Sequence, residues 1–150
     1  MIKTIIIEDE KPAARKLQRL LSSFEEIEIV AILHSVEESI EFFENEEHPQ
    51  LIFSDIVLGD GLSFDIFDKI QSKSFIIYTT AFDNYTLKAF KLNSIDYLLK
   101  PITEDDLRGA ITKFKSFLPK DQQYDQLNFK DLIRKETPEL NRVVVKIGYN

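Results

Sequence analysis

The sequence predicts an α/β protein with a doubly wound sandwich, in which helices cover both faces of a five-stranded parallel sheet. Short apolar runs alternate along the chain with segments whose apolar residues recur at helical spacing. The first run, Ile2–Ile7, is nearly continuous and β-branched, which is typical of a strand buried on both faces. Parallel strands need crossover connections, which are usually helices, so the alternation indicates a parallel sheet.

The first half of the chain contains three predicted strands and two predicted helices. A helix begins at Pro12, and its apolar residues share one face: Ala13, Leu17, Leu20, Leu21 and Phe24. The second and third strands are predicted at 28–33 and 51–54. Between them, Ser35 and Glu38 have the spacing of a capping box, which opens a second helix that closes before His48-Pro49.

The second half continues the same alternation. The third helix is predicted by apolar residues at fourfold spacing: Leu62, Ile66 and Ile70. Two further strands, at 75–79 and 95–99, flank a fourth helix at 84–92. Thr103 and Asp106 repeat the capping-box spacing before the last helix, whose apolar stripe is Leu107, Ile111, Phe114 and Leu118.

Composition and charge limit the classes of function. The chain is 43% hydrophobic and 30% charged, as expected of a soluble globular protein. The net charge is −8 over residues 1–118 and +1 over residues 119–150, so the acidic first part is not expected to bind nucleic acid by itself. Cysteine is absent, no apolar run approaches about 18 residues, and the N-terminus lacks a signal-peptide pattern. We therefore expect a cytoplasmic protein without disulfides or a membrane span.

Polar residues follow four of the predicted strands: Glu8 and Asp9, Asp55, Thr80 and Lys100. The carboxyl ends of parallel strands meet at one edge of a sheet, where doubly wound proteins bind ligands. Carboxylates brought together there repel one another unless a cation shares the site, and Mg²⁺ prefers oxygen ligands. With a lysine nearby, an aspartate in such a site can attack a phosphoryl group. Taken alone, Asp55 could also be a capping or turn residue, although this is the weaker interpretation.

The motifs Glu8-Asp9, Asp55, Thr80-Ala81 and Lys100-Pro101, in this order, resemble those of the receiver domain of two-component response regulators. The resemblance covers residues 1–118 and implies a flavodoxin-like fold. It makes Asp55 the acceptor of a phosphoryl group donated by a sensor histidine kinase, in a switch rather than an enzyme that turns over an external substrate.

The resemblance also implies the roles of the surrounding residues. Mg²⁺ would be held by Asp9, Asp55, the backbone carbonyl of Val57 and, through water, Glu8. The phosphoryl oxygens would be bound by the Thr80 hydroxyl, the backbone of Ala81 and the Lys100 ammonium group. Tyr97 would be the switch aromatic that turns inward when Thr80 moves, and the Lys100–Pro101 peptide would be cis.

Longer stretches of sequence resemble one branch of this family. These stretches are residues 79–82, 87–90 and 96–101, and they resemble receivers of the LytR/AlgR group, which regulate transcription through a LytTR-type DNA-binding domain. By this resemblance, residues 119–141 are a linker and residues 142–150 begin that domain. DNA binding would then belong to the missing part of the domain.

Several alternatives stay open at this stage. Glu8 stands where aspartate is commoner in receivers. The segment from Asp55 to Gly61 is two residues shorter than the usual receiver loop and has Gly59 instead of proline. Because of these departures, a pseudo-receiver that binds partners without phosphorylation is an alternative. A hydrolase with an aspartyl phosphate intermediate would need a second acid at Val57, and a nucleotide-binding domain would need a glycine-rich loop after the first strand.

The partner surfaces are equally undecided. A homodimer through the fourth helix, fifth strand and fifth helix could pair Lys88 or Lys91 with acidic residues of the other copy: Asp96, Asp105 or Asp106. The same residues could simply be solvated. His34 and His48 have no partners at metal-ligand or catalytic spacing and are predicted to be structural or surface residues.

Overall fold

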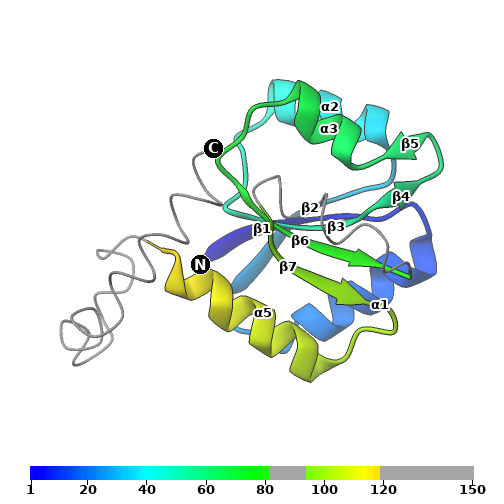
Figure 1. Ribbon diagram of the computed structural model, residues 1–150. Coiled ribbons are helices and arrows are strands. Elements are labelled where there is room, and N and C mark those ends of the chain that lie inside the picture. The colour runs from blue at the N-terminus through cyan, green and yellow to red at the C-terminus, as the bar shows by residue number, and fades with distance from the viewer. Residues whose placement is uncertain (82–93, 119–150) are drawn as a thin grey trace.

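The computed structural model describes residues 1–81 and 94–118, with the backbone alone at positions 94 and 95. Five parallel strands form the sheet in the order β2-β1-β3-β6-β7 (Figure 1). Their bounds are Ile2–Ile7 (β1), Ile27–Leu33 (β2), Leu51–Asp55 (β3), Phe75–Thr80 (β6) and Ser94–Leu99 (β7). The chain steps from β1 to one side for β2 and to the other side for β3, so the strand order reverses beside β1.

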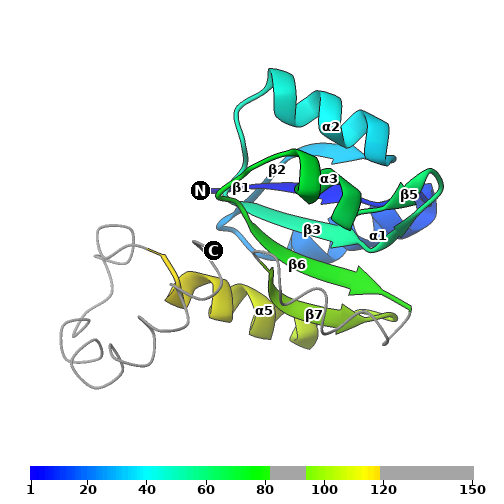
Figure 2. The same ribbon diagram turned by 45° about the horizontal axis from the view of Figure 1, so that its top comes forward.

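Helices cover both faces of this sheet, which confirms the predicted doubly wound architecture. The bounds of the four described helices are Lys11–Leu21 (α1), Val36–Asn45 (α2), Phe64–Lys69 (α3) and Glu104–Ser116 (α5). Figures 1 and 2 show α1 and α5 together on one face and α2 and α3 on the other. Each layer encloses its own apolar core; Phe53 and Phe114 lie in the first, and Ile52 and Tyr78 in the second.

The two predicted capping boxes have different outcomes. Before α5, Asp106 N donates to Thr103 Oγ1 at 3.1 Å and Thr103 N donates to Asp106 Oδ2 at 3.0 Å, so this box is confirmed. Before α2, Glu38 N donates to Ser35 Oγ at 3.0 Å, but the Glu38 carboxylate accepts from His34 N at 2.6 Å and not from Ser35 N. Half of this predicted box is therefore wrong, because the end of β2 presents the N–H of His34 to Glu38.

The third helix is shorter than predicted. It begins at Phe64, because Leu62 lies in a short antiparallel hairpin of β4 (Val57–Leu58) and β5 (Gly61–Leu62) that directly follows β3. Ile70 follows its last residue, Lys69, as the C-cap. The hairpin closes the segment after Asp55 with the tip Gly59-Asp60, and this explains how a shortened loop still connects β3 to α3.

Other boundaries shift by one to three residues. The first helix ends at Leu21 and not at Phe24, because Ser22 Oγ and Ser23 Oγ donate to carbonyls of its last turn. The Lys100–Pro101 peptide is cis, as predicted. The predicted helix at 84–92 and everything after residue 118 lie outside the described residues. Within the described residues, no helix has the length and apolar character needed to cross a membrane.

Candidate functional site

The ends of four neighbouring strands bring the predicted site residues to one edge of the sheet. Glu8 and Asp9 follow β1, Asp55 is the last residue of β3, Thr80 is the last residue of β6, and Lys100 follows β7. The strand register places Ile7 opposite Ser54, Asp55 opposite Thr79, and Thr80 opposite Leu99. In-register parallel pairing therefore turns positions distant in sequence into one cluster.

Three carboxylates form the centre of this cluster. Glu8, Asp9 and Asp55 each offer an oxygen, and these oxygens lie within 4.8 Å of one another. Glu8 is 3% exposed and Asp55 is 7% exposed. Buried carboxylates this close together need a shared cation, and a set of oxygen donors fits the ligand preference of Mg²⁺. The residues present therefore fit a Mg²⁺ site.

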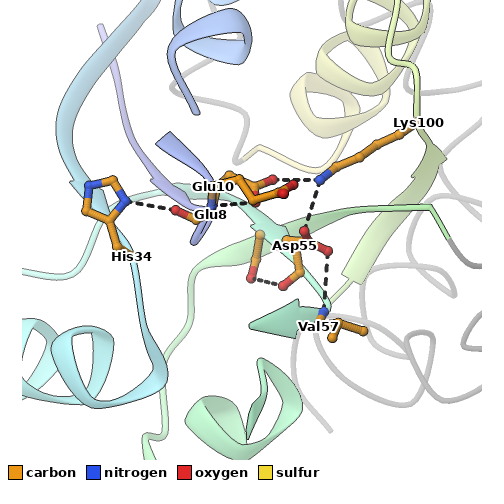
Figure 3. Close-up of polar contacts among 7 residues, drawn as sticks. Glu8, Glu10, His34, Asp55, Val57 and Lys100 are labelled. Atoms are coloured by element: carbon orange, nitrogen blue, oxygen red, sulfur yellow. Dashed lines mark hydrogen bonds and ion pairs between the residues drawn. The ribbon is translucent and has the colours of Figure 1, made fainter. Parts of the chain in front are cut away.

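Lys100 joins two of these carboxylates (Figure 3). Its Nζ donates to Glu8 Oε1 at 2.7 Å and to Asp55 Oδ2 at 2.9 Å. Burial opposes the charged form of the lysine, but the hydrogen bonds to Glu8 and Asp55, together with the negative charges of these two residues, outweigh burial and raise the pKa of Lys100. The ammonium group therefore stays charged within the acidic cluster.

The carboxyl group of Glu8 has a raised pKa. Burial raises the pKa of Glu8 to about 7, although the hydrogen bond from Lys100 acts in the opposite direction; the nearby charge of Asp55 adds to the rise. Glu10 N donates to Glu8 Oε2 at 3.2 Å, and the Glu8 carbonyl lies 2.9 Å from His34 Nδ1. Glu8 is therefore held firmly in place and takes up a proton near neutral pH.

The histidines have structural contacts, as predicted. His34 contacts the main chain of Glu8, and His48 Nε2 lies 2.8 Å from the Phe43 carbonyl. His48 Nδ1 lies 3.1 Å from Ser72 Oγ. Both rings thus contact neighbouring parts of the fold, and neither side chain is part of the acidic cluster.

The remaining predicted site residues are Val57, Thr80, Ala81 and Tyr97, and they differ in their contacts and burial. Val57 N donates to Asp55 Oδ1 at 3.3 Å, so Val57 is directly adjacent to the cluster. Thr80 is fully buried, and its carbonyl accepts from Lys100 N at 2.8 Å; Ala81 follows it and is exposed. Tyr97 is half-buried on β7 and packs against the core beneath α2 and α3, opposite Tyr78 in the register.

An apolar groove of about 360 Å³ opens beside Lys100. It is lined by residues of α1 and of the segment that follows β7: Ala13, Lys16, Leu17, Leu20, Lys100, Pro101 and Ile102. The site edge therefore adjoins a surface with both apolar and cationic side chains.

Asp60 has a role that the sequence interpretation missed. Its Oδ1 accepts from Val36 N at 2.8 Å and its Oδ2 accepts from Glu37 N at 3.1 Å. Both oxygens are thereby occupied at the start of α2, so Asp60 is not placed to serve as the general acid of a hydrolase. No sequence signal could have revealed this contact, because the partners are 23 and 24 positions away.

Comparison with known proteins decides the family. Residues 4–112 match the family described as "Response regulator receiver domain". The chain belongs to the response regulator receiver family. The receiver interpretation of the sequence is thus confirmed, and the flavodoxin-like strand order of the sheet agrees with it.

Relatives of this receiver domain include sensory transduction proteins. The protein LytT of Bacillus anthracis is 30% identical over 152 residues, which cover 98% of this chain and 59% of LytT. LytT of Enterococcus faecalis is 36% identical over 112 residues, which cover 73% of this chain and 46% of that protein. The chain therefore spans about half the length of the curated relatives it matches.

A solved structure shows the same fold. The response regulatory domain of the mrkE protein from Klebsiella pneumoniae superimposes with a TM-score of 0.67 and 28% sequence identity. The match covers 77% of this chain and 96% of that domain. The described receiver domain thus corresponds to nearly all of a domain solved separately.

Proposed function

We propose that residues 1–118 are a phosphorylation switch in which Asp55 accepts a phosphoryl group from a sensor histidine kinase. The observation that carries this proposal is the contact of Lys100 with both Asp55 and Glu8 inside a cluster of three carboxylates. An aspartate, oxygen donors for a cation and a buried lysine are the groups that in-line phosphoryl transfer needs.

In the proposed reaction, a carboxylate oxygen of Asp55 attacks the phosphorus of a phosphohistidine. The new O–P bond forms as the N–P bond breaks, and the imidazole leaves with the electron pair of that bond. Asp9, Asp55, the Val57 carbonyl and, through water, Glu8 would hold Mg²⁺, which when bound neutralises charge on the phosphoryl oxygens.

Lys100 changes its partners during the proposed reaction. Before transfer, its ammonium group compensates the charges of Glu8 and Asp55 at 2.7 and 2.9 Å. After transfer, Asp55 carries the phosphoryl group, and Lys100 pairs with one of its oxygens. The Thr80 hydroxyl and the backbone N–H of Ala81 would bind the others. Hydrolysis of the acyl phosphate by water returns the switch to its starting state.

Phosphorylation would change the conformation of Thr80 and Tyr97. Movement of Thr80 toward the phosphoryl group would free space for Tyr97 to turn further inward, and this would change the surface around β7. We propose that residues 119–141 link this surface to a LytTR-type DNA-binding domain, which begins at residues 142–150 and through which the whole protein regulates transcription. The alignment with LytT of Bacillus anthracis, which covers 98% of this chain, supports that arrangement.

A phosphorylation-dependent homodimer through the face of β7 and α5 is a further part of the proposal. Two of its candidate acidic residues form ion pairs within the chain: Asp96 pairs with Lys113 at 3.6 Å, and Asp105 pairs with Arg108 at 2.7 Å. A dimer contact would have to replace these exposed ion pairs, which cost little to break. Lys88 and Lys91 lie outside the described residues.

Asp55→Asn tests the proposed function. Incubation with acetyl phosphate and Mg²⁺ should add one phosphoryl group to the wild type, mapped by peptide mass to Asp55, and none to the variant. Asp68→Asn, at an exposed position of α3, is the control and should be labelled normally. Labelling of Asp55→Asn would contradict the assignment. Sedimentation of the labelled wild type over a wide concentration range tests the dimer, which an unchanged mass would exclude.

A further inference from the structure

The hairpin that follows Asp55 is attached to α2 by Asp60. The two oxygens of Asp60 accept hydrogen bonds from Val36 N and Glu37 N, at 2.8 and 3.1 Å. These are the first two N–H groups of α2, and such groups have no acceptor within their own helix. The hydrogen bond from Val36 is the main cause of the lowered pKa of Asp60. A charged side chain of the hairpin therefore caps a helix that precedes it by more than twenty residues.

The tip of the hairpin passes between α2 and the acidic cluster. A Cβ atom at Gly59 would lie 3.6 Å from Asp9 Oδ2, and one at Gly61 would lie 3.5 Å from Val36 Cγ2 and 3.1 Å from Asp65 Oδ2. Gly61 has a φ of 152°, a value that favours glycine. Gly61 thus allows the backbone to pass close to Asp65 and the start of α2, while Gly59 places the other side of the tip next to Asp9, a predicted metal ligand.

The same hairpin determines where Val57 lies. Val57 N donates to Asp55 Oδ1 at 3.3 Å, and Val57 is paired with Leu62 across the hairpin. Ser63 N donates to the Ile56 carbonyl at 2.8 Å and closes the base of the hairpin. The peptide that carries the Val57 carbonyl is therefore fixed at one end by Asp55 and at the other by the segment that Asp60 anchors.

We propose that Asp60 is a positioning residue for Mg²⁺ binding: by bonding Val36 and Glu37, it holds the hairpin in which the Val57 N–H contacts Asp55 and the Val57 carbonyl would be a Mg²⁺ ligand. This inference rests on the proposed Mg²⁺-dependent function. Loss of a group that orients a metal ligand weakens metal binding by about 10- to 100-fold. Asp60 acts through a short hairpin and not on a ligand directly, so we expect the lower end of this range.

The test is a Mg²⁺ titration of the full chain, followed by amide resonances near Asp55. Asp60→Ala should raise the dissociation constant for Mg²⁺ about 10-fold. Asp60→Asn keeps one acceptor oxygen and should raise the dissociation constant by an intermediate amount. This variant tests the proposal even if Asp60→Ala does not fold. Ser35→Ala is the matched control, because it removes a cap at the same end of α2, the 3.0 Å hydrogen bond from Glu38 N, without changing the hairpin.

The control separates positioning from helix stability. Ser35→Ala should lower the melting temperature and leave the Mg²⁺ dissociation constant unchanged. In the wild type, Mg²⁺ should also slow hydrogen exchange at Val36 N and Glu37 N, since coupling between two sites is reciprocal; Asp60→Ala should abolish that slowing.

Three results would overturn the inference. Equal Mg²⁺ dissociation constants for the wild type and Asp60→Ala would show that the hairpin needs no anchor. Equal weakening by Ser35→Ala would show that the effect comes from general loosening of α2. If the wild type itself bound no Mg²⁺, the proposed function would fall and the inference with it, so the two failures are distinguishable.

Discussion

The body of the central strand β3 and its carboxyl end differ in what they contribute. Leu51, Ile52 and Phe53 are fully buried and pack into the two apolar cores. Two residues after Phe53, Asp55 is nearly as buried, yet its neighbours are two other carboxylates and a lysine. The strands on either side also change from apolar to polar at this end: Glu8 directly follows Ile7, the last residue of β1, and β6 ends in Tyr78, Thr79 and Thr80.

This contrast shows that stability and function are separated along the same strands. Buried apolar side chains stabilise the fold, at about 25 cal/mol for each Å² removed from water. Buried carboxylates work against it, because desolvation opposes their charge. Mutations in the body should therefore lower stability, and mutations at the edge should change chemistry while leaving stability equal or higher.

Phe53→Ala tests the body of the strand and has the largest expected effect. Truncation of a buried phenylalanine leaves a cavity, so the free energy of unfolding should fall by about 3–5 kcal/mol. Urea unfolding measures this change, and Phe53→Leu, which keeps most of the volume, should lose less than about 1.5 kcal/mol. A small loss for Phe53→Ala would mean that the body does not carry the stability assigned to it.

Lys100→Met tests the chemistry of the edge. Loss of the ammonium group should slow phosphorylation of Asp55 by acetyl phosphate about 100-fold, which equals about 2.7 kcal/mol of activation free energy. Mg²⁺ should bind more tightly, because a positive charge has been removed from its site. Lys113→Met is the matched control: it removes the exposed contact with Asp96 at 3.6 Å and should leave both quantities unchanged. A normal rate of phosphorylation for Lys100→Met would show that Lys100 takes no part in the reaction.

Glu8→Gln has the smallest expected effect and tests the stability of the edge. The folded-state pKa of Glu8, about 7, lies above its ordinary value of 4.5, so the folded protein retains this proton more tightly than the unfolded chain. Without Mg²⁺, stability should fall as the pH rises from 4.5 to about 7. At pH 8 in EDTA, Glu8→Gln should be more stable than the wild type by about 1–3 kcal/mol, and near pH 4.5 the difference should vanish.

The control for this comparison is Glu28→Gln, an exposed glutamate on β2. Urea unfolding of this variant should match the wild type at both pH values, within about 0.5 kcal/mol. If Glu8→Gln proved less stable than the wild type at pH 8, the ion pair with Lys100 would outweigh the cost of burial, and the contrast between body and edge would not hold.

Features that depend on residues close together in sequence were predicted better than features that depend on distant residues. The box of Thr103 and Asp106 is a local signal, and it was predicted with both of its hydrogen bonds. The start of α2 was predicted only in part, because two of its N–H groups are capped by Asp60 from a distant hairpin. The hairpin itself was not predicted, since Leu62 fits the apolar spacing of a helix as well as that of a strand.

The sequence by itself determined the alternation of strands and helices and the polar residues at the strand ends. Period and residue type carry that information locally, and they were enough to group Glu8, Asp55 and Lys100 as one site. Only the tertiary structure decided how these groups interact: the two bonds of Lys100, the raised pKa of Glu8 and the anchoring of the loop by Asp60. The physical reason is that desolvation, charge coupling and capping between segments depend on distances in space, which separation along the chain does not encode.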